Sequence, residues 1–405
     1  MFKVSLFMDM KLTAFLFCFI LSSGDLYAER AAVEIVSEVK SELGLRQTKI
    51  KGLLVVELNN GDLAGTASQM NATAMNKGSG FVIQFNQEVG EMMKGATEEV
   101  DKFIRVRYPE SLPDNTLVEL SFADKYTPKD GPSAAVVCAL MVDSIISGNE
   151  LDPGFAATGD MTATGEVQPV GGVPSKVKGA IRKKCTHIAI PLANKNSIID
   201  ESILKGLESL HQIQIFTIED FEQAHALASS ERPEDIQTAI DEFALVQKAL
   251  KKNPKYIYNS QVREKLSKII ELAPNHLSAG LLHLYSNRNE PKKLSIAGSI
   301  RGLDNAGAKL GNMMENGSYI KAQGLGNDVL AELVTEMNRL RPKLDKRTID
   351  YSDSYVDIAN FIKKHRGRKR FTEQLVREIN QLSSKIDQQR DTLINRSDVQ
   401  EELME

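Results

Sequence analysis

The sequence has 405 residues, of which 42% are hydrophobic and 26% charged, and its formal net charge is −4. This length leaves room for two or three domains with real cores, and the composition argues against wholesale disorder and against a general nucleic-acid-binding protein. Three cysteines, one of them in a segment that we expect to be removed, are too few for a disulfide framework or for a zinc site built from cysteines.

The first 28 residues have the order of a secretory signal peptide. Lys3 and Lys11 precede an apolar run over 12–21, and small and polar residues then lead to Ala28, after which we expect cleavage. The run is about half as long as the roughly 20 residues that span a bilayer, so a cleaved signal is favoured over a membrane anchor. The true start is open among three methionines, Met1, Met8 and Met10.

Cleavage of this signal would leave a periplasmic or secreted protein with no membrane span. Outside the cytoplasm a disulfide can form, yet both remaining cysteines lie in apolar contexts that equally suit buried free thiols. The sequence therefore leaves open whether a disulfide joins these two residues, Cys138 and Cys185.

Strand and helix patterns alternate from a lead-in helix or linker over 29–46 as far as about residue 230. Apolar runs bounded by turn residues predict strands, and 3.6-residue periodicity predicts helices. The predicted strands are 52–58, 80–85, 117–122, 187–191 and 213–218, and the predicted helices are 87–107, 132–147 and 219–229. Because strand signals stop near 231, we expect one α+β domain over 47–230 and an all-helical region after it.

The helical region divides into a helical domain over 231–345 and a helical, coiled-coil-like tail over 346–405. Residues 268–285 resemble the helix-turn-helix joint of a tetratricopeptide repeat, but one unit makes no array, so a plain helical bundle is the alternative. A basic run over 363–370 predicts a solvated face, with an anion-binding patch as the alternative. The apolar positions of the tail follow a heptad pattern at Leu375, Ile379, Leu382, Ile386 and Leu393.

The segment 127–176 carries the candidate chemistry. Gly131 and Pro132 open the apolar helix, with Gly131 as N-cap and Pro132 at a position where a missing N–H costs nothing. Ser133 then stands in the first turn, where unpaired amides and the positive end of the helix dipole favour an alkoxide or an adjacent oxyanion. A glycine and a proline before a serine are also common turn chemistry.

Three stretches, TPKDGPSA at 127–134, ATGD at 157–160 and GEVQPVGGVPSK at 165–176, resemble the proteolytic domain of the Lon proteases. The resemblance covers about 47–226. It implies an α+β fold in which a serine nucleophile and a lysine general base form a dyad, with substrate lying near 161–170. By this resemblance Ser133 is the nucleophile and Lys176 is the general base. The resemblance also implies that the hydroxyl of Thr158 orients the lysine. Asp160, at a position where the family often has glutamate, would have a supporting role.

General chemistry agrees with this assignment. A serine hydroxyl needs a neighbouring base, and a lysine serves as one only when burial keeps part of it neutral. Lys176 follows 169–174, a segment poor in carboxylates. A serine–histidine–aspartate triad is the competing arrangement, but none of the six histidines stands in a matching motif: His187, His211, His225, His276, His283 and His365.

The departures from the family bear on function. No Gly-x-x-x-x-Gly-Lys-Ser/Thr loop of an ATPase module occurs in the sequence. The family usually has glycine at the position of Ala135. Many of its members have histidines at the positions of Glu119 and Ser121. We therefore expect an ATP-independent serine endopeptidase that cuts unfolded or flexible polypeptides outside the cytoplasm.

The alternative is a catalytically inactive Lon-fold protein whose helical region mediates binding or assembly. For both functions we expect no cofactor, no metal and no nucleic-acid partner, and a homo-oligomer is left open. The sequence determines neither the cleavage specificity nor the physiological substrate.

Overall fold

The computed structural model describes residues 46–57, 63–124, 130–315, 326–365, 372–397 and 399–400. The predicted signal segment, the lead-in helix and most of the basic run lie outside these residues, as does the start of the TPKDGPSA motif. Across the described parts of the chain, no helix is both long and apolar enough to cross a membrane.

A seven-stranded mixed sheet forms the centre of the first half of the chain, with strand order β3-β4-β2-β1-β5-β8-β9. β1 pairs antiparallel with β2 and β2 with β4, whereas β3–β4, β1–β5, β5–β8 and β8–β9 are parallel pairs. The strands are β1 (Gln47–Glu57), β2 (Leu63–Asn76), β3 (Phe81–Phe85), β4 (Thr116–Phe122), β5 (Phe155–Ala157), β8 (His187–Pro191) and β9 (Gln214–Ile218). A separate hairpin pairs β6 (Asp160–Met161) with β7 (Val167–Gln168).

Helices interleave with these strands as the sequence predicts. They are α3 (Glu91–Arg107), α4 (Ala135–Ser147), α5 (Val173–Arg182), α6 (Lys195–Lys205), α7 (Glu208–Gln212) and α8 (Phe221–Ala228), with short 3₁₀ turns η1 (Pro132–Ala134) and η2 (Leu192–Asn194). The predicted helix over 132–147 thus begins as a 3₁₀ turn. α4 is apolar on all sides because it lies in the core, where every residue from Ala135 to Ile145 is buried.

α5 lies unusually close to the sheet. A Cβ atom on Gly65 of β2 would stand 1.8 Å from the carbonyl oxygen of Ser175, and one on Gly179 would stand 2.5 Å from the amide nitrogen of Thr66. Only glycine fits at these two positions, because any side chain would push helix and strand apart. The pair of glycines therefore fixes how deeply Lys176, on the same helix, sits in the domain.

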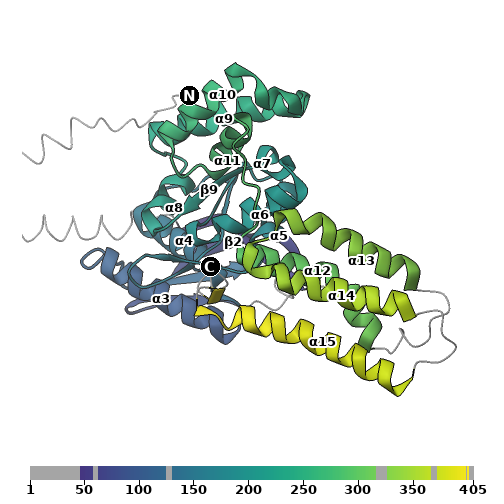
Figure 1. Ribbon diagram of the computed structural model, residues 1–405. Coiled ribbons are helices and arrows are strands. Elements are labelled where there is room, and N and C mark those ends of the chain that lie inside the picture. Colours follow the sequence, from purple (N-terminus) through teal and green to yellow (C-terminus); the bar gives the residue numbers. More distant parts are fainter. Residues whose placement is uncertain are drawn as a thin grey trace, which may run out of the picture.

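All described elements after residue 230 are helical. They are α9 (Glu234–Lys252), η3 (Pro254–Tyr258), α10 (Ser260–Leu272), α11 (Leu277–Ser286), α12 (Ile296–Glu315), α13 (Gly326–Leu340), η4 (Arg341–Lys343), η5 (Lys346–Thr348), α14 (Ile349–His365) and α15 (Glu373–Ile394). This confirms the predicted fold class, a mixed α and β domain followed by helices. In Figure 1, α9–α11 stand above the sheet and α12–α15 extend to one side as an elongated bundle.

The helices α9–α11 share the apolar core of the sheet, which continues without a break from Ile50 to Leu282. Their contact with the sheet is also polar: the backbone N–H of Ile215 in β9 donates to Ser278 Oγ at 3.0 Å, and that of Thr217 donates to the Asn275 carbonyl at 2.9 Å. The predicted domain boundary near 231 stays a prediction, as does the kinship of α10 and α11 to a tetratricopeptide repeat.

A second apolar cluster begins at Leu294 and joins α12–α15. The heptad positions of the tail contribute to it: Ile379, Ile386 and Leu393 are buried in this cluster, and Leu382 packs against it. In the first cluster, Cys138 and Cys185 are buried free thiols.

Candidate active site

Ser133 lies in the 3₁₀ turn that leads into α4, and it is half-buried. Its carbonyl oxygen accepts two hydrogen bonds, from the N–H of Gly159 at 3.0 Å and from the hydroxyl of Thr158 at 3.0 Å. The turn is anchored further by Val136, whose N–H donates to the Gly159 carbonyl at 3.2 Å. The serine backbone is thus fixed to the segment between β5 and β6.

Lys176 lies in the second turn of α5 with 1% of its surface exposed. Its Nζ donates to Thr158 Oγ1 at 2.9 Å, and Thr158 is itself fully buried, with its N–H bonded to the Ala189 carbonyl. The single hydroxyl of Thr158 therefore accepts from Lys176 and donates to the Ser133 carbonyl. It joins the two predicted catalytic residues, which are 43 positions apart in the sequence.

Burial lowers the pKa of Lys176 to about 8, because the apolar surroundings disfavour the charged ammonium. In the described residues no carboxylate forms an ion pair with Lys176. At pH 7 about a tenth of the lysine is then neutral, against well under a thousandth for an unperturbed lysine.

Among the described residues no direct hydrogen bond joins Ser133 Oγ to Lys176 Nζ. Catalytic hydrogen bonds are often long in the absence of substrate and shorten in its complex. The N–H of Ala135 is used by the Pro132 carbonyl, and no side chain among the described residues caps η1 or α4.

Among the described residues, the remaining predicted site residues form no hydrogen bond or ion pair with Lys176. Gly131 is extended and Pro132 begins the turn, as the sequence indicates. Asp160 lies in β6 and its carboxylate accepts from the N–H of Met161 at 2.7 Å, while burial raises its pKa. No described hydrogen bond links Asp160 to the lysine, so its supporting role stays a prediction.

Two further acidic residues have structural partners that the sequence did not indicate. Asp130, directly before Gly131, accepts from the N–H of Met92 at 3.1 Å and so caps α3. Glu119, in the place of a family histidine, accepts from Asn86 Nδ2 at 2.9 Å. A capping aspartate 38 residues away from its helix has no local sequence signal.

Among the described residues no histidine forms a hydrogen bond with Ser133, and two of them have strongly lowered pKa values. Burial lowers the pKa of His187 to about 4 and that of His276 to about 3, so both are neutral at pH 7. His187 uses its ring nitrogens on Thr186 Oγ1 and the Leu227 carbonyl, and His276 uses its own on Gln214 and a backbone N–H. Both rings are therefore occupied by structural contacts.

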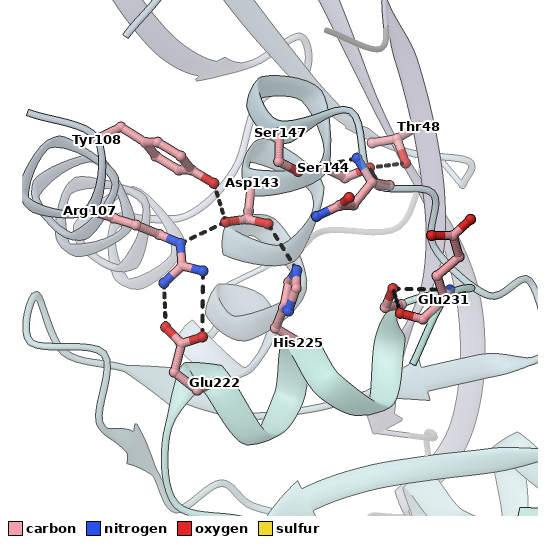
Figure 2. Close-up of polar contacts among 11 residues, drawn as sticks. Thr48, Arg107, Tyr108, Asp143, Ser144, Ser147, Glu222, His225 and Glu231 are labelled. Atoms are coloured by element: carbon pink, nitrogen blue, oxygen red, sulfur yellow. Dashed lines mark hydrogen bonds and ion pairs between the residues drawn. The ribbon is translucent and has the colours of Figure 1, made fainter. Parts of the chain in front are cut away.

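A buried ionic network lies around Asp143 in α4 (Figure 2). The carboxylate of Asp143, 2% exposed, accepts from Arg107 Nε and from the Tyr108 hydroxyl, each at 2.7 Å, and pairs with His225 Nε2 at 3.3 Å. Arg107 also pairs with Glu222 of α8. The network connects the end of α3, the middle of α4 and α8, and sequence reasoning missed it.

Similarity to known proteins indicates a serine-type peptidase domain. Residues 38–227 match the family model of the Lon protease (S16) C-terminal proteolytic domain. Similar proteins include the Lon protease of Azospirillum brasilense, 28% identical over 153 residues, and the mitochondrial Lon protease homolog of Homo sapiens, 32% identical over 157 residues. Residues 38–227 are thus a Lon-type proteolytic domain.

These matches are partial in both directions. Each covers 36% of this chain, and they cover 18% of the A. brasilense protein and 16% of the human one. The Lon protease of Borrelia duttonii, 33% identical over 128 residues, is covered to 15%. The chain therefore spans less than a fifth of the length of these relatives.

Proposed function

We propose that this protein is a serine endopeptidase in which Ser133 is the nucleophile and Lys176 the general base, and that it cuts unfolded or flexible polypeptides outside the cytoplasm without ATP. One observation carries the proposal. The hydroxyl of Thr158 contacts both the buried Lys176 Nζ, at 2.9 Å, and the Ser133 carbonyl, at 3.0 Å, and burial lowers the pKa of that lysine.

In this mechanism neutral Lys176 accepts the proton of Ser133 Oγ as the oxygen attacks the substrate carbonyl carbon. The resulting oxyanion is stabilised by N–H groups at the start of α4. The lysine then gives its proton to the departing amine, and an acyl-serine is left. Water, deprotonated by Lys176, attacks the ester, and the return of the proton to Ser133 Oγ releases the carboxylic acid product.

The decisive experiment uses the purified protein with casein as a flexible substrate and a fluorophosphonate probe for an activated serine. We expect casein fragments to accumulate and the probe to attach to Ser133, whereas the Ser133→Ala variant should neither cleave casein nor react with the probe.

The second candidate function is that of a catalytically inactive binding protein. It is favoured by the lack of a direct hydrogen bond between Ser133 Oγ and Lys176 Nζ among the described residues. Intact casein together with an unlabelled serine would support that candidate instead.

The rate should follow the ionisation of Lys176. Because the lysine acts when neutral and its pKa is about 8, activity is expected to rise about tenfold per pH unit below 7 and to level off above about 9. The measurement is the rate per enzyme on a small uncharged peptide from pH 5.5 to 10, with stability checked at each end (a range set by roughly two units around the pKa). A rate that is half-maximal at about pH 6.5 and has reached its plateau by about pH 7.5 would point to a histidine base instead.

The independence from ATP rests on the lack of a phosphate loop in the sequence. Adding ATP and magnesium is expected to leave the rate of casein digestion unchanged, and a stably folded substrate should survive, because nothing in the sequence supplies an energy-driven unfolding step. Several-fold stimulation by ATP would contradict this part of the proposal and indicate a nucleotide site.

A further inference from the structure

A cavity of about 170 Å³ opens beside the first turn of α5. Its floor is the loop that runs from Pro169 into α5, one wall is formed by η2 and the start of α6, and the other wall by the first residues of α12. A cavity of about 150 Å³ accommodates a molecule the size of benzene, so this one is large enough for a single carboxylate-bearing group.

The cavity has one charged lining residue, Arg301 of α12; the other described lining residues are neutral. Its side chain is 55% exposed, and its Nη2 forms a long ion pair with Asp200 Oδ2 at 4.0 Å. That carboxylate already accepts from the N–H of Ser295 at 2.8 Å and from its hydroxyl at 2.6 Å. The guanidinium of Arg301 therefore retains N–H donors that can bind an anion.

The walls of the cavity are held in place by buried polar contacts. Asp200 is 4% exposed and binds the start of α12 through Ser295, and a Cβ atom on Gly298 would stand 2.1 Å from the Asp200 carboxylate. On the other side, the N–H of Val170 donates to Asn194 Oδ1 at 2.9 Å. The helical region thus forms one wall of a cavity, and the segment that forms the cavity floor continues along the chain to Lys176.

The cavity is also near the candidate nucleophile. The Ser133 carbonyl accepts from Gly159, the next residue Asp160 pairs with Gln168, and Pro169 follows in the cavity floor. At about 5 Å for each step between strands and about 3.8 Å for each step along the chain, this path is no longer than about 18 Å. An extended peptide covers that distance with about five residues.

We propose that Arg301 is a specificity-determining residue which binds a substrate carboxylate in this cavity, whose floor begins at Pro169, about five extended residues from the Ser133 backbone. The carboxylate belongs to an acidic side chain or to the C-terminus of the polypeptide, and the guanidinium recognises it through a charge-assisted hydrogen bond. The inference rests on the proposed peptidase function, and it gives the helical region a direct part in substrate choice.

The test compares fluorogenic peptides that differ in one group. In one series a single Glu, or Gln in the paired peptide, stands at each position from about two to about six residues on either side of the scissile bond. These positions cover the distance of about five extended residues estimated above. In the other series a neutral peptide carries a free or an amidated C-terminus. We expect one position, or the free C-terminus, to raise kcat/KM about tenfold, and Arg301→Gln to remove this preference while neutral peptides are cleaved at nearly the wild-type rate.

A matched control is Arg377→Gln on α15, where the side chain is 75% exposed and far along the sequence from the cavity. This variant should keep the preference. Hydrolysis of the neutral peptide reports the proposed function, and the Glu to Gln ratio reports the role of Arg301. A preference that survives Arg301→Gln, or equal rates for all pairs, would overturn the inference.

Binding extends the test to a protein that turns over no peptide. The same peptides, labelled with a fluorophore, are titrated against Ser133→Ala and against the double variant that also carries Arg301→Gln. If Ser133→Ala binds the acidic peptide more tightly than the neutral one and the double variant does not, the role of Arg301 is supported. If the two proteins bind the acidic peptide with equal affinity, that role is contradicted.

Discussion

Replacing Ser133 with alanine or Lys176 with methionine is expected to lower the rate of peptide hydrolysis by at least about 1,000-fold, because nucleophile and base act as one unit. For the same reason the double variant should be little worse than either single one. The measurement is kcat/KM on a flexible peptide for wild type, both single variants and the double variant.

Both substitutions should leave the fold intact. Ser133 is half-buried and uses its carbonyl, not its side chain, in the described contacts. Methionine has nearly the length of lysine and needs no hydration, so Lys176→Met should be at least as stable as wild type. Lys178→Met, on the same helix but 44% exposed and paired with Glu201, is the matched control and should retain activity. Substantial turnover by Lys176→Met would contradict the dyad.

The largest expected effect on stability comes from Asp143→Ala. The alanine leaves Arg107, Tyr108 and His225 without the carboxylate that binds all three, and removing one partner of a buried ion pair is strongly destabilising. We expect a loss of about 3 kcal/mol in the free energy of unfolding, which lowers Tm by roughly 6–12 °C. Urea denaturation followed by circular dichroism measures it.

An exposed pair provides the comparison. Asp357, 51% exposed, binds Lys385 at 3.1 Å, and Asp357→Ala should cost less than about 1 kcal/mol. Equal losses in the two variants would show that the buried network contributes no more than a surface ion pair.

The contribution of Asp143 to the free energy of unfolding should decrease both in acidic and in alkaline solution. Burial raises the pKa of this carboxyl, but hydrogen bonds from His225 and Tyr108 and the charge of Arg107 lower it further than burial raises it. Its stabilisation is therefore present above the unfolded pKa of aspartate and is lost as the pH falls through the lower folded value.

The hydrogen bond to Asp143 raises the pKa of His225, against the effect of burial. Its stabilisation is present below the unfolded pKa of histidine and is lost as the pH rises through the folded value. The difference between wild type and Asp143→Ala should therefore be largest in mildly acidic solution and smaller at both ends.

The elements that could be predicted from the sequence are those whose buried positions form a run of consecutive, mostly apolar residues. β8 and β9 are buried at all five positions each, and their apolar runs are visible without a structure. The strand β2 was not predicted, because its sequence LAGTASQMNATAMN is rich in small and polar residues. It is a strand because β1 and β4 pair with both its edges, and its small residues admit the close approach of α5.

The same distinction holds for the candidate site. Ser133, Thr158 and Lys176 lie in ordered motifs within one stretch of chain, so their association was predictable. Arg107 and Glu222 are 115 positions apart and meet only through the packing of α3 against α8. Arg301 reaches the cavity beside α5 from the helical region for the same kind of reason. Contacts that depend on packing between distant helices leave no pattern of spacing to read.

The turn over Asn275–Ser278 occupies the outer hydrogen-bonding edge of β9, where a further strand would otherwise pair. An uncovered edge of this kind is a template on which a second copy of the chain can add its own strand. The helices α10 and α11 therefore do for the sheet what a capping unit does at the end of a repeat protein: they terminate it. A chain cut after Ser229 would lose that termination and would be expected to self-associate through β9.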